Sequence, residues 1–234
     1  MSDKLMEMFG GDFIFLNPLD NACATLADYN AAYDITDNAI EPWVVGATIA
    51  TDQLFCGMPT LYFDGEDSQD YMRIIEGSLD RLRTLFNPLA FTMITCAKID
   101  NKDVWKDSVR RGHHSFKWDL DNWFFVRKST PYNLLQAMYT SHGVNYEHTA
   151  SIDTRDWFMT VVTFDLLADE FSFYVNDKLI GTHRGIKAWP PGEIPWVYLG
   201  FEGNSWYGWL STIGLMSRAL TQQEVIDVYG LISG

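Results

Sequence analysis

The final third of the chain carries a fixed succession of sequence patterns that constrains the fold more than any other feature. Residues 157–165 have the length and apolar content of a buried β-strand. Residues 171–181 follow with the pattern of a strand, a turn and a second strand, and residues 197–201 and 208–216 predict two further strands. A helix closes the chain, so this order predicts an all-β domain with a short C-terminal helix.

The strand-turn-strand segment has the pattern of a half-buried hairpin. Phe171, Phe173 and Val175 alternate with more polar neighbours, which is the period of two expected of a strand with one buried face. Asn176 and Asp177 stand where the chain reverses. Both residue types tolerate the positive φ that a two-residue hairpin turn requires, so we predict a tight turn at this point.

A capping box marks the start of the closing helix. The Thr221 hydroxyl is placed to accept a hydrogen bond from the Glu224 amide, and the Glu224 carboxylate to accept one from the Thr221 amide. Val225, Val228, Tyr229 and Ile232 then fall on one helical face. The helix is predicted to dock by that face, with a structural role.

Shorter patterns fill the first two thirds of the chain. Residues 1–11 are predicted to form an N-terminal arm, residues 78–86 a short helix, and strands are predicted at residues 12–16, 61–65, 71–75, 90–97, 123–127 and 134–139. The run at 90–97 is apolar throughout, as expected for a central strand buried on both faces. No linker, repeat or low-complexity tract interrupts residues 12–234, which are therefore predicted to form a single domain.

The order of these elements resembles the laminin-G-like jelly roll of the concanavalin A-like lectin/glucanase superfamily. The likeness is strongest over residues 157–229 and weaker at 61–65, at Asp70-Tyr71 and at 91–98. The phrase at 208–211 lacks the acidic residue that the family usually has there. The resemblance implies a two-sheet antiparallel jelly-roll sandwich with a small terminal helix, a fold that serves mainly as a recognition scaffold.

Charge and cysteine content exclude several classes of function. The formal net charge of −14 argues against nucleic-acid binding and against attachment to anionic membranes. Asp3, Glu7 and Asp12 interrupt any N-terminal apolar run, so no signal peptide is expected, and no charge-free stretch reaches the ~18 residues of a membrane span. The three cysteines Cys23, Cys56 and Cys96 have no ligand spacing, which favours reduced, buried thiols and synthesis in the cytoplasm; a Cys23–Cys56 disulfide is the alternative.

Motifs of catalysis are absent from the sequence. Superfamily hydrolases use the triplet Glu-x-Asp-x-x-Glu, in which acid/base and nucleophile lie about 5 Å apart, and this chain has no such triplet. His113 and His114 are adjacent, and adjacent strand residues point to opposite faces, so they are not expected to chelate one ion. The sequence therefore favours a protein that is not an enzyme.

An acidic cluster and several loop aromatics are the candidate ligand sites. Asp64, Asp67 and Asp70 leave two interpretations open: a structural acidic turn, which we favour, or a Ca²⁺ site. Ca²⁺ is the only cofactor that the sequence suggests. Exposed aromatic rings stack on sugars and amides bind hydroxyls, so the candidate glycan-binding residues are Trp189, Asn204, Trp206 and Tyr207. For Trp196 and Trp209 we expect packing between the sheets.

Residues 98–122 lack clean periodicity and mix aromatic with basic residues in an otherwise acidic chain. We expect a solvated loop that docks a partner, and its candidate contact residues are Trp105, Arg110, Arg111, His113, His114 and Trp118. Deletion of residues 103–119 is accordingly expected to leave the fold intact and to abolish assembly.

Three hypotheses of function remain. The first is a non-enzymatic structural and recognition component of a bacteriophage virion, on the capsid, tail or fibre, because such a protein is made in a reducing cytosol and acts outside the cell. Its partners would be other virion proteins or copies of itself, with a surface glycan as ligand. The alternatives are a stand-alone carbohydrate-binding module and a polysaccharide-degrading enzyme with unfamiliar residues.

Overall fold

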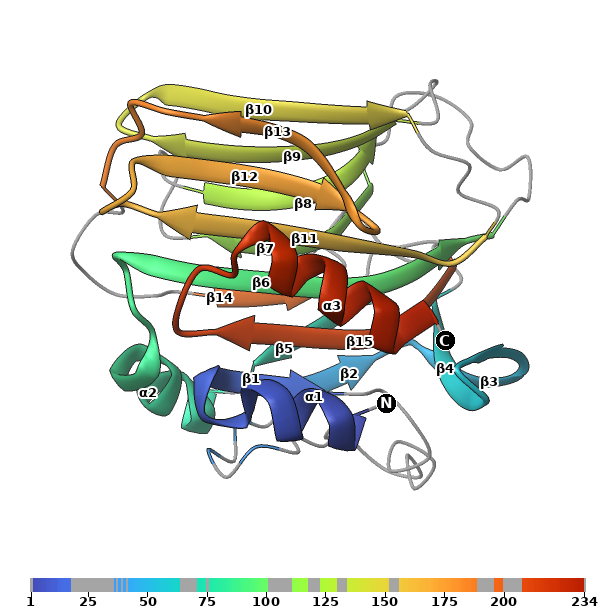
Figure 1. The fold of residues 1–234 in the computed structure, drawn as a ribbon. Coiled ribbons are helices and arrows are strands. Elements are labelled where there is room, and N and C mark those ends of the chain that lie inside the picture. The colour runs from blue at the N-terminus through green and yellow to red at the C-terminus, as the bar shows by residue number, and fades with distance from the viewer. Residues whose placement is uncertain are drawn as a thin grey trace.

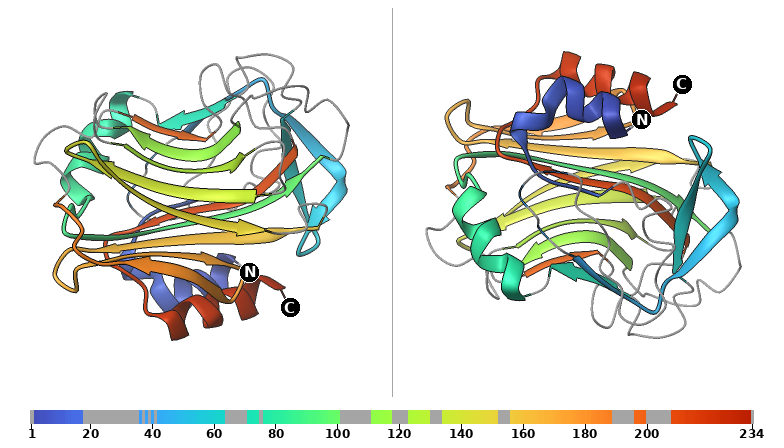
Figure 2. Two further views of the ribbon diagram at one scale, coloured as in Figure 1. Left: turned by 90° about the horizontal axis from the view of Figure 1, so that it is seen from above. Right: turned by 90° about the horizontal axis from the view of Figure 1, so that it is seen from below.

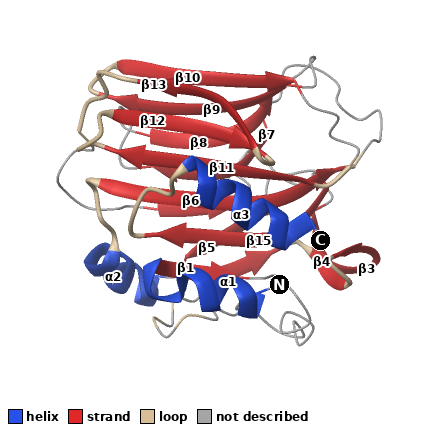
Figure 3. Ribbon diagram, in the orientation of Figure 1, coloured by secondary structure: helices blue, strands red, loops and turns tan. Residues whose placement is uncertain are grey.

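The structure, a computed structural model, is a sandwich of two antiparallel sheets (Figures 1 and 3). It describes residues 2–17, 36, 38, 40, 42–63, 71–74, 76–100, 111–117, 123–129, 134–151, 156–188, 196–199 and 208–233. The predicted all-β, two-sheet jelly-roll sandwich with a short C-terminal helix is confirmed.

The larger sheet has eight strands and contains both ends of the chain's β-structure. In spatial order its strands are β13 (Lys178–His183), β12 (Glu170–Val175), β11 (Phe158–Asp165), β6 (Ala90–Ile99), β15 (Gly208–Met216), β4 (Met58–Phe63) and β3 (Thr48–Phe55). The eighth strand, β1 (Phe13–Asn17), pairs with the second half of β15, beyond the residues that pair with β4.

The smaller sheet has seven strands. Their order is β10 (Val144–Ser151), β9 (Leu134–Ser141), β8 (Trp123–Ser129), β7 (Arg111–Lys117), β14 (Trp196–Leu199), β5 (Tyr71–Ile74) and β2 (Pro42–Val45). The strands predicted at 61–65 and 71–75 correspond to β4 and β5, which belong to different sheets.

Helices cover the larger sheet and close one end of the sandwich. α1 (Ser2–Phe9) and α3 (Gln222–Ser233) lie side by side on the outer face of the eight-stranded sheet (Figure 2). The predicted helix at 78–86 is α2 (Glu76–Leu85), whose Leu79 and Leu82 are buried in the core between the sheets. No helix in the described part of the chain is long and apolar enough to cross a membrane.

β6 is buried on both faces, as its sequence predicts. Met93 and Ala97 belong to the core between the sheets, whereas Ile94 and Cys96 belong to a second core beneath α1 and α3. Both cores are apolar, so burial of this one strand couples all three layers of the molecule.

The segment expected as an N-terminal arm is a packed helix followed by a 3-10 turn, η1 (Gly10–Asp12). Leu5 and Phe9 of α1 are buried in the second core, together with Val225 and Val228 of α3. The residues at 5 and 9 are one helical turn apart, which is the only periodic signal that this short segment offers.

The capping box at the start of α3 is confirmed and extended by an arginine. The Glu224 carboxylate accepts a hydrogen bond from the Thr221 amide at 2.8 Å, and the Glu224 amide donates to the Thr221 hydroxyl at 3.3 Å. Arg218 donates to both carboxylate oxygens of Glu224 and to Asp12. These arginine hydrogen bonds are the main cause that lowers the pKa of Glu224 to about 2.

The tight turn of the predicted hairpin is confirmed in β12 and β13. Asn176 has a φ of 57°, and Asp177 is absent from the described residues with positive φ. The register shifts between Phe173 and Tyr174, so an irregularity in the ladder accompanies a turn that has one left-handed residue rather than two.

The expectation of a loop throughout residues 98–122 is wrong in two places. Residues 98–99 are the end of β6. Residues 111–117 form β7, which pairs with β8 on one side and β14 on the other. A bulge leaves His113 between the paired residues Gly112 and His114, which interrupts the alternation that sequence analysis relies on. Deletion of residues 103–119 would remove an internal strand, so the expectation that it leaves the fold intact is also wrong.

Trp209 does not pack between the sheets. Its cross-strand neighbours are Lys98 and Tyr62, and Lys98 alternates with Cys96 on the outer face of β6. The indole lies 5.1 Å from the Tyr62 ring and 5.6 Å from the Lys98 ammonium, measured to ring centroids, and it is partly buried. The side chain of Trp196 lies outside the described residues.

Two histidines join the open edges of the sheets, where β10 lies beside β13 (Figure 1). The ring centroids of His148 and His183 are 4.3 Å apart. A Cβ at Gly181 would lie 2.5 Å from Nδ1 of His148, so only glycine lets this ring pack on β13. Burial, together with the charge of His183, lowers the pKa of His148.

We predict that the free energy of unfolding falls as the pH is lowered from about 7.5 to about 5.5. Because the pKa of His148 is lower in the folded protein, the unfolded chain binds this proton at a higher pH than the folded one. The contribution of His148 to stability is therefore complete above the ordinary histidine pKa of ~6.5 and is lost as the pH falls below it. Glu224 stays ionised in the folded protein over this range. Urea unfolding of the wild type and of His148→Gln measures the effect, and an equal pH dependence in both would contradict it.

A pair of glycine substitutions tests the backbone geometry. Gly208 has a φ of 137°, and a Cβ there would lie 2.2 Å from the carbonyl oxygen of Lys98, so we expect Gly208→Ala to cost on the order of 3 kcal/mol. Gly230 lies in α3, and a Cβ at that position would meet no described heavy atom within 4 Å, so Gly230→Ala is expected to stabilise by about 0.5 kcal/mol. Chemical unfolding measures both, and equal effects would be inconsistent with this geometry.

Candidate functional site

A groove of about 430 Å³ lies where the β3–β4 hairpin, the start of β11 and the end of α3 converge. Its lining consists of residues 54–56 from the hairpin, residues 156–159 from β11 and its preceding turn, Asn176 from the β12–β13 turn, and Tyr229, Ile232 and Ser233 from α3. We call it the hairpin–helix groove. Its volume is within the ~300–1,000 Å³ of small-molecule sites in proteins.

The hairpin wall of the groove is set by an unusual turn. Cys56 and Gly57 have φ values of 50° and 76°, and Phe55 pairs with Met58, as in a two-residue hairpin turn with two left-handed residues. The Cys56 thiol donates to the carbonyl of Ile232 at 2.7 Å, which ties the hairpin to the last turn of α3. Cys56 is exposed, so the expectation of a buried thiol is wrong for it, but partial desolvation of the sulfur still raises its pKa and keeps it protonated at neutral pH.

Two aromatic rings form the floor of the groove. The ring centroids of Phe55 and Trp157 are 4.7 Å apart, with 48° between the ring planes. Phe55 is buried in the core beneath the helices, whereas Trp157 is only partly buried and lines the groove. The buried Phe55 ring therefore packs against the indole and restricts the movement of an aromatic side chain that lines the groove.

Two polar side chains flank this aromatic floor. Asp156 is exposed and precedes Trp157 in the chain. Oδ1 of Asn176 accepts a hydrogen bond from the backbone N–H of Met159 at 2.9 Å, and the backbone N–H of Asn176 donates to the Met159 carbonyl at 2.8 Å. With its oxygen held in this way, Asn176 has its side-chain NH₂ to offer to a ligand.

This combination can bind but is poorly equipped to catalyse. An indole face, a carboxylate and an amide match a sugar, which has apolar C–H faces and hydroxyl groups. Among the described lining residues Asp156 is the only carboxylate, whereas glycoside hydrolysis requires two that act together.

The predicted ligand residues cannot be compared with this groove. Trp189, Asn204, Trp206 and Tyr207 lie outside the described residues, as do Asp64, Asp67 and Asp70 of the acidic cluster. Within the part of the chain that is described, no group of three His, Cys, Asp or Glu side chains could hold a metal ion. The glycan-binding and calcium predictions at these positions therefore stay predictions.

The predicted partner-docking residues are only partly placed. Trp105, Arg110 and Trp118 lie outside the described residues, whereas Arg111, His113 and His114 lie on β7. The side chains of these three are not described, so their docking role stays a prediction.

The hairpin–helix groove was missed by sequence reasoning. Its residues come from four segments of the chain, and only the dipeptide Asp156-Trp157 places an acid beside an aromatic ring at the start of a predicted strand. That local signal could have marked one wall of the groove, but the convergence of the other segments depends on the fold.

Two packed antiparallel sheets with a terminal helix define a lectin-type jelly-roll fold. The chain belongs to the concanavalin A-like lectin/glucanase superfamily, because a laminin-G-type model of that superfamily matches residues 64–226. The family resemblance seen in the sequence is thereby confirmed.

Solved structures share this fold at low sequence identity. The receptor-binding domain of a botulinum neurotoxin C/D mosaic serotype superposes with a TM-score of 0.70 and 12% identity, over 94% of this chain and 51% of that one. Domain 4 of AbnA, an extracellular arabinanase from Geobacillus stearothermophilus solved with arabinotriose, gives 0.67 and 12%, over 93% of this chain and 98% of that one. The binding domain of botulinum neurotoxin DC, solved with rat synaptotagmin II, gives 0.65 and 13%, over 96% and 52%.

The chain thus spans about half the length of the toxin domains and nearly all of the arabinanase domain. At these identities the likeness shows a common fold, in which the similar domains are of a binding type. A comparison with curated proteins gives no match.

Proposed function

We propose that this protein is a non-enzymatic recognition module that binds a glycan in the hairpin–helix groove. The observation that carries the proposal is the partly buried Trp157, supported from below by Phe55 and flanked by Asp156 and Asn176 in a groove of about 430 Å³. A rigid aromatic surface with hydrogen-bonding groups at its edge loses little conformational entropy when a sugar binds.

The chemistry of the groove favours a neutral sugar. The Trp157 ring offers a face to the C–H groups of a pyranose or furanose, and the Asn176 NH₂ and the Asp156 carboxylate can bind its hydroxyls. Because the Asp156 carboxylate lines the groove and is exposed, it would repel an acidic sugar at this site.

The likeness to other binding domains supports the same class of ligand. The arabinanase domain was solved with arabinotriose, and a toxin of the similar fold depends on two ganglioside molecules for cell entry. These facts belong to those proteins, and they support the proposal only by showing that such domains occur in glycan-binding proteins.

Substitution of Trp157 tests the proposal. On an array of neutral and acidic glycans, including arabino-oligosaccharides, we expect the wild type to bind a neutral oligosaccharide and Trp157→Ala to bind it about tenfold more weakly or not at all. Trp157→Phe should keep part of the affinity, because it keeps a ring.

The matched control is Leu167→Ala, which removes an exposed apolar side chain from the β11–β12 turn, outside the groove. Its affinity should equal that of the wild type. If no glycan binds, or if Trp157→Ala binds as the wild type does while Trp189→Ala or Trp206→Ala loses binding, the groove is not the glycan site.

The finer proposal concerns where the module works. Within the described residues Cys56 and Cys96 are free thiols, which supports synthesis in a reducing cytoplasm. A glycan-binding protein made there would meet its ligand after release by lysis. On this basis the module is a structural component of a bacteriophage virion, on its capsid, tail or fibre, with copies of itself or other virion proteins as partners.

Assembly state tests the virion proposal, because virion parts act through symmetric repetition. Light scattering on the purified protein at micromolar concentration is expected to give a multiple of the 26.8 kDa chain mass. A monomer throughout the concentration series would argue against a self-assembling virion component and would favour a stand-alone carbohydrate-binding module.

A further inference from the structure

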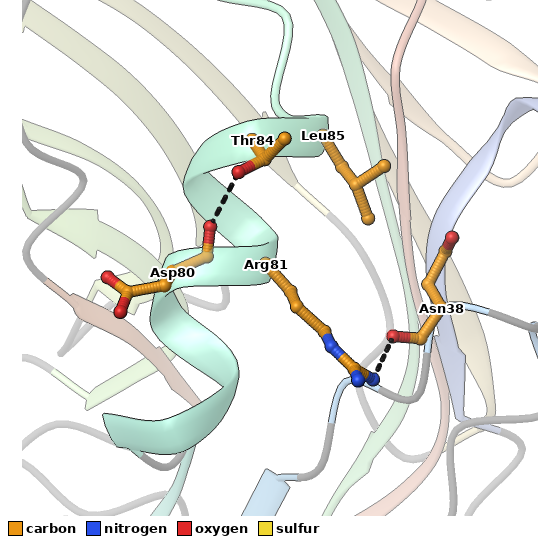
Figure 4. A pocket seen from close by; sticks show the side chains of 5 residues that line it. All are labelled: Asn38, Asp80, Arg81, Thr84 and Leu85. Atoms are coloured by element: carbon orange, nitrogen blue, oxygen red, sulfur yellow. Dashed lines mark hydrogen bonds between the residues drawn. The ribbon is translucent and has the colours of Figure 1, made fainter.

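A second hollow, of about 480 Å³, lies beside α2 and is lined by Asn38, Asp80, Arg81, Thr84 and Leu85. We call it the α2 pocket. Arg81 and Leu85 are one helical turn apart, and Figure 4 shows both side chains directed toward Asn38, with Asp80 directed away from them. The face that the helix presents to this pocket is therefore a guanidinium group beside an apolar side chain.

The charge of Arg81 is not neutralised by a carboxylate among the described residues. Its neighbour Arg83 pairs with Asp80 at 2.7 Å, and Arg184 and Arg218 also pair with acidic side chains. The hydrogen bond recorded for Arg81 goes from Nη1 to the backbone carbonyl of Asn38, at 3.1 Å. Acidic residues outnumber basic ones by 31 to 17, so an arginine with no carboxylate partner among the described residues is unexpected in this chain.

The bond to Asn38 also holds the guanidinium group in position. The Asn38 side chain donates to the carbonyl oxygens of Phe13 and Ile14, each at 3.0 Å, and so anchors this carbonyl to β1. With Nη1 engaged, the edge formed by Nη2 and Nε is available in the geometry that binds a carboxylate through two parallel hydrogen bonds. Preorganisation of this kind reduces the entropy lost when a ligand binds.

The other described lining residues favour an acid that also has an apolar face. Leu85 is 36% exposed and adds an apolar wall beside the guanidinium group. The Asp80 carboxylate, the acidic group of the described lining, is paired with Arg83 and points away, so it repels an incoming anion less. The Thr84 hydroxyl donates to the Asp80 carbonyl at 2.9 Å, which leaves its oxygen as an acceptor.

We propose that the α2 pocket is a second ligand site, in which Arg81 binds the carboxylate of an acidic sugar whose apolar face packs on Leu85. The site is independent of the hairpin–helix groove, which favours a neutral ligand, and it does not rest on the function proposed for that groove. Its ligand class is a uronic acid or another small sugar acid.

Titration with glucuronate, followed by calorimetry and by amide chemical shifts in NMR spectra, tests this site. We expect binding to the wild type with shifts centred on α2 and Asn38, and no comparable shifts there with glucose, which lacks the carboxylate. Arg81→Gln should lower the affinity at least about tenfold, and Arg81→Lys should fall between, because it keeps the charge but loses the fork.

Arg184→Gln is the matched control, since it removes one arginine charge outside the α2 pocket, where Arg184 pairs with Glu170. It should bind as the wild type does. Equal losses in Arg81→Gln and Arg184→Gln would mean attraction by net charge alone and would overturn the proposal, as would unchanged binding by Arg81→Gln or no binding by the wild type.

Two further arms separate the sources of the signal. Acetate that binds as tightly as glucuronate would overturn the sugar assignment, whereas much weaker acetate binding supports it. Trp157→Ala should leave glucuronate binding unchanged, so failure at the α2 pocket and failure at the hairpin–helix groove can be told apart.

Discussion

Burial of the eight-stranded sheet on both of its faces is the constraint on which the rest of the structure depends. β6 places Met93 and Ala97 against the seven-stranded sheet and Ile94 and Cys96 against the helices. A sheet that is apolar on both faces needs two covers, and α1 and α3 provide the second. Because α3 packs on the outer face of this sheet, its last turn lies beside the β3–β4 turn, and the hairpin–helix groove forms between them.

The position of α3 is fixed by a polar clamp in addition to apolar contact. Arg218 lies between the end of β15 and the helix and bonds both Asp12, which precedes β1, and Glu224 in the first helical turn. Since these three side chains are partly exposed, the ion pairs contribute little to stability, and their main effect is to orient the start of α3 relative to β1 and β15. At the other end of α3, the Cys56 thiol bonds the carbonyl of Ile232.

Elements that carry their own local signal were predictable from the sequence. Three short patterns each predict their structure from a few residues: the capping box of Thr221 and Glu224, the alternation from Phe171 to Val175 and the apolar run of β6. The tight turn at Asn176 was predictable for the same reason, because few residue types accept its φ of 57°.

Elements whose stability comes from distant partners were not predictable. β7 contains Gly112 and a bulge at His113, so its alternation is broken, and it forms a strand because β8 and β14 supply hydrogen-bonding partners. α1 is short and depends on burial of Leu5 and Phe9 beneath it rather than on helix propensity. Trp209 was misassigned because its face is set by pairing with Lys98 and Tyr62.

Candidate sites are less predictable than folds because they join segments that are distant in sequence. Asp156 and Trp157 are neighbours in the chain, but Phe55, Asn176 and the end of α3 reach the groove only through the sheet register. Asn38 and Arg81 are likewise joined across 43 positions by one hydrogen bond to a backbone carbonyl.

The register of β6 also keeps the two proposed sites apart. α2 directly precedes the first residue of β6. The start of β11 pairs with the other end of β6, where Phe158 lies opposite Ala97. A strand of this length spans about 30 Å, so the α2 pocket and the hairpin–helix groove lie at opposite ends of it. A single sugar cannot reach from Arg81 to Trp157. The opposite charge preferences of the two sites therefore describe two separate ligands, or two distant parts of one long polymer that carries both neutral and acidic sugars.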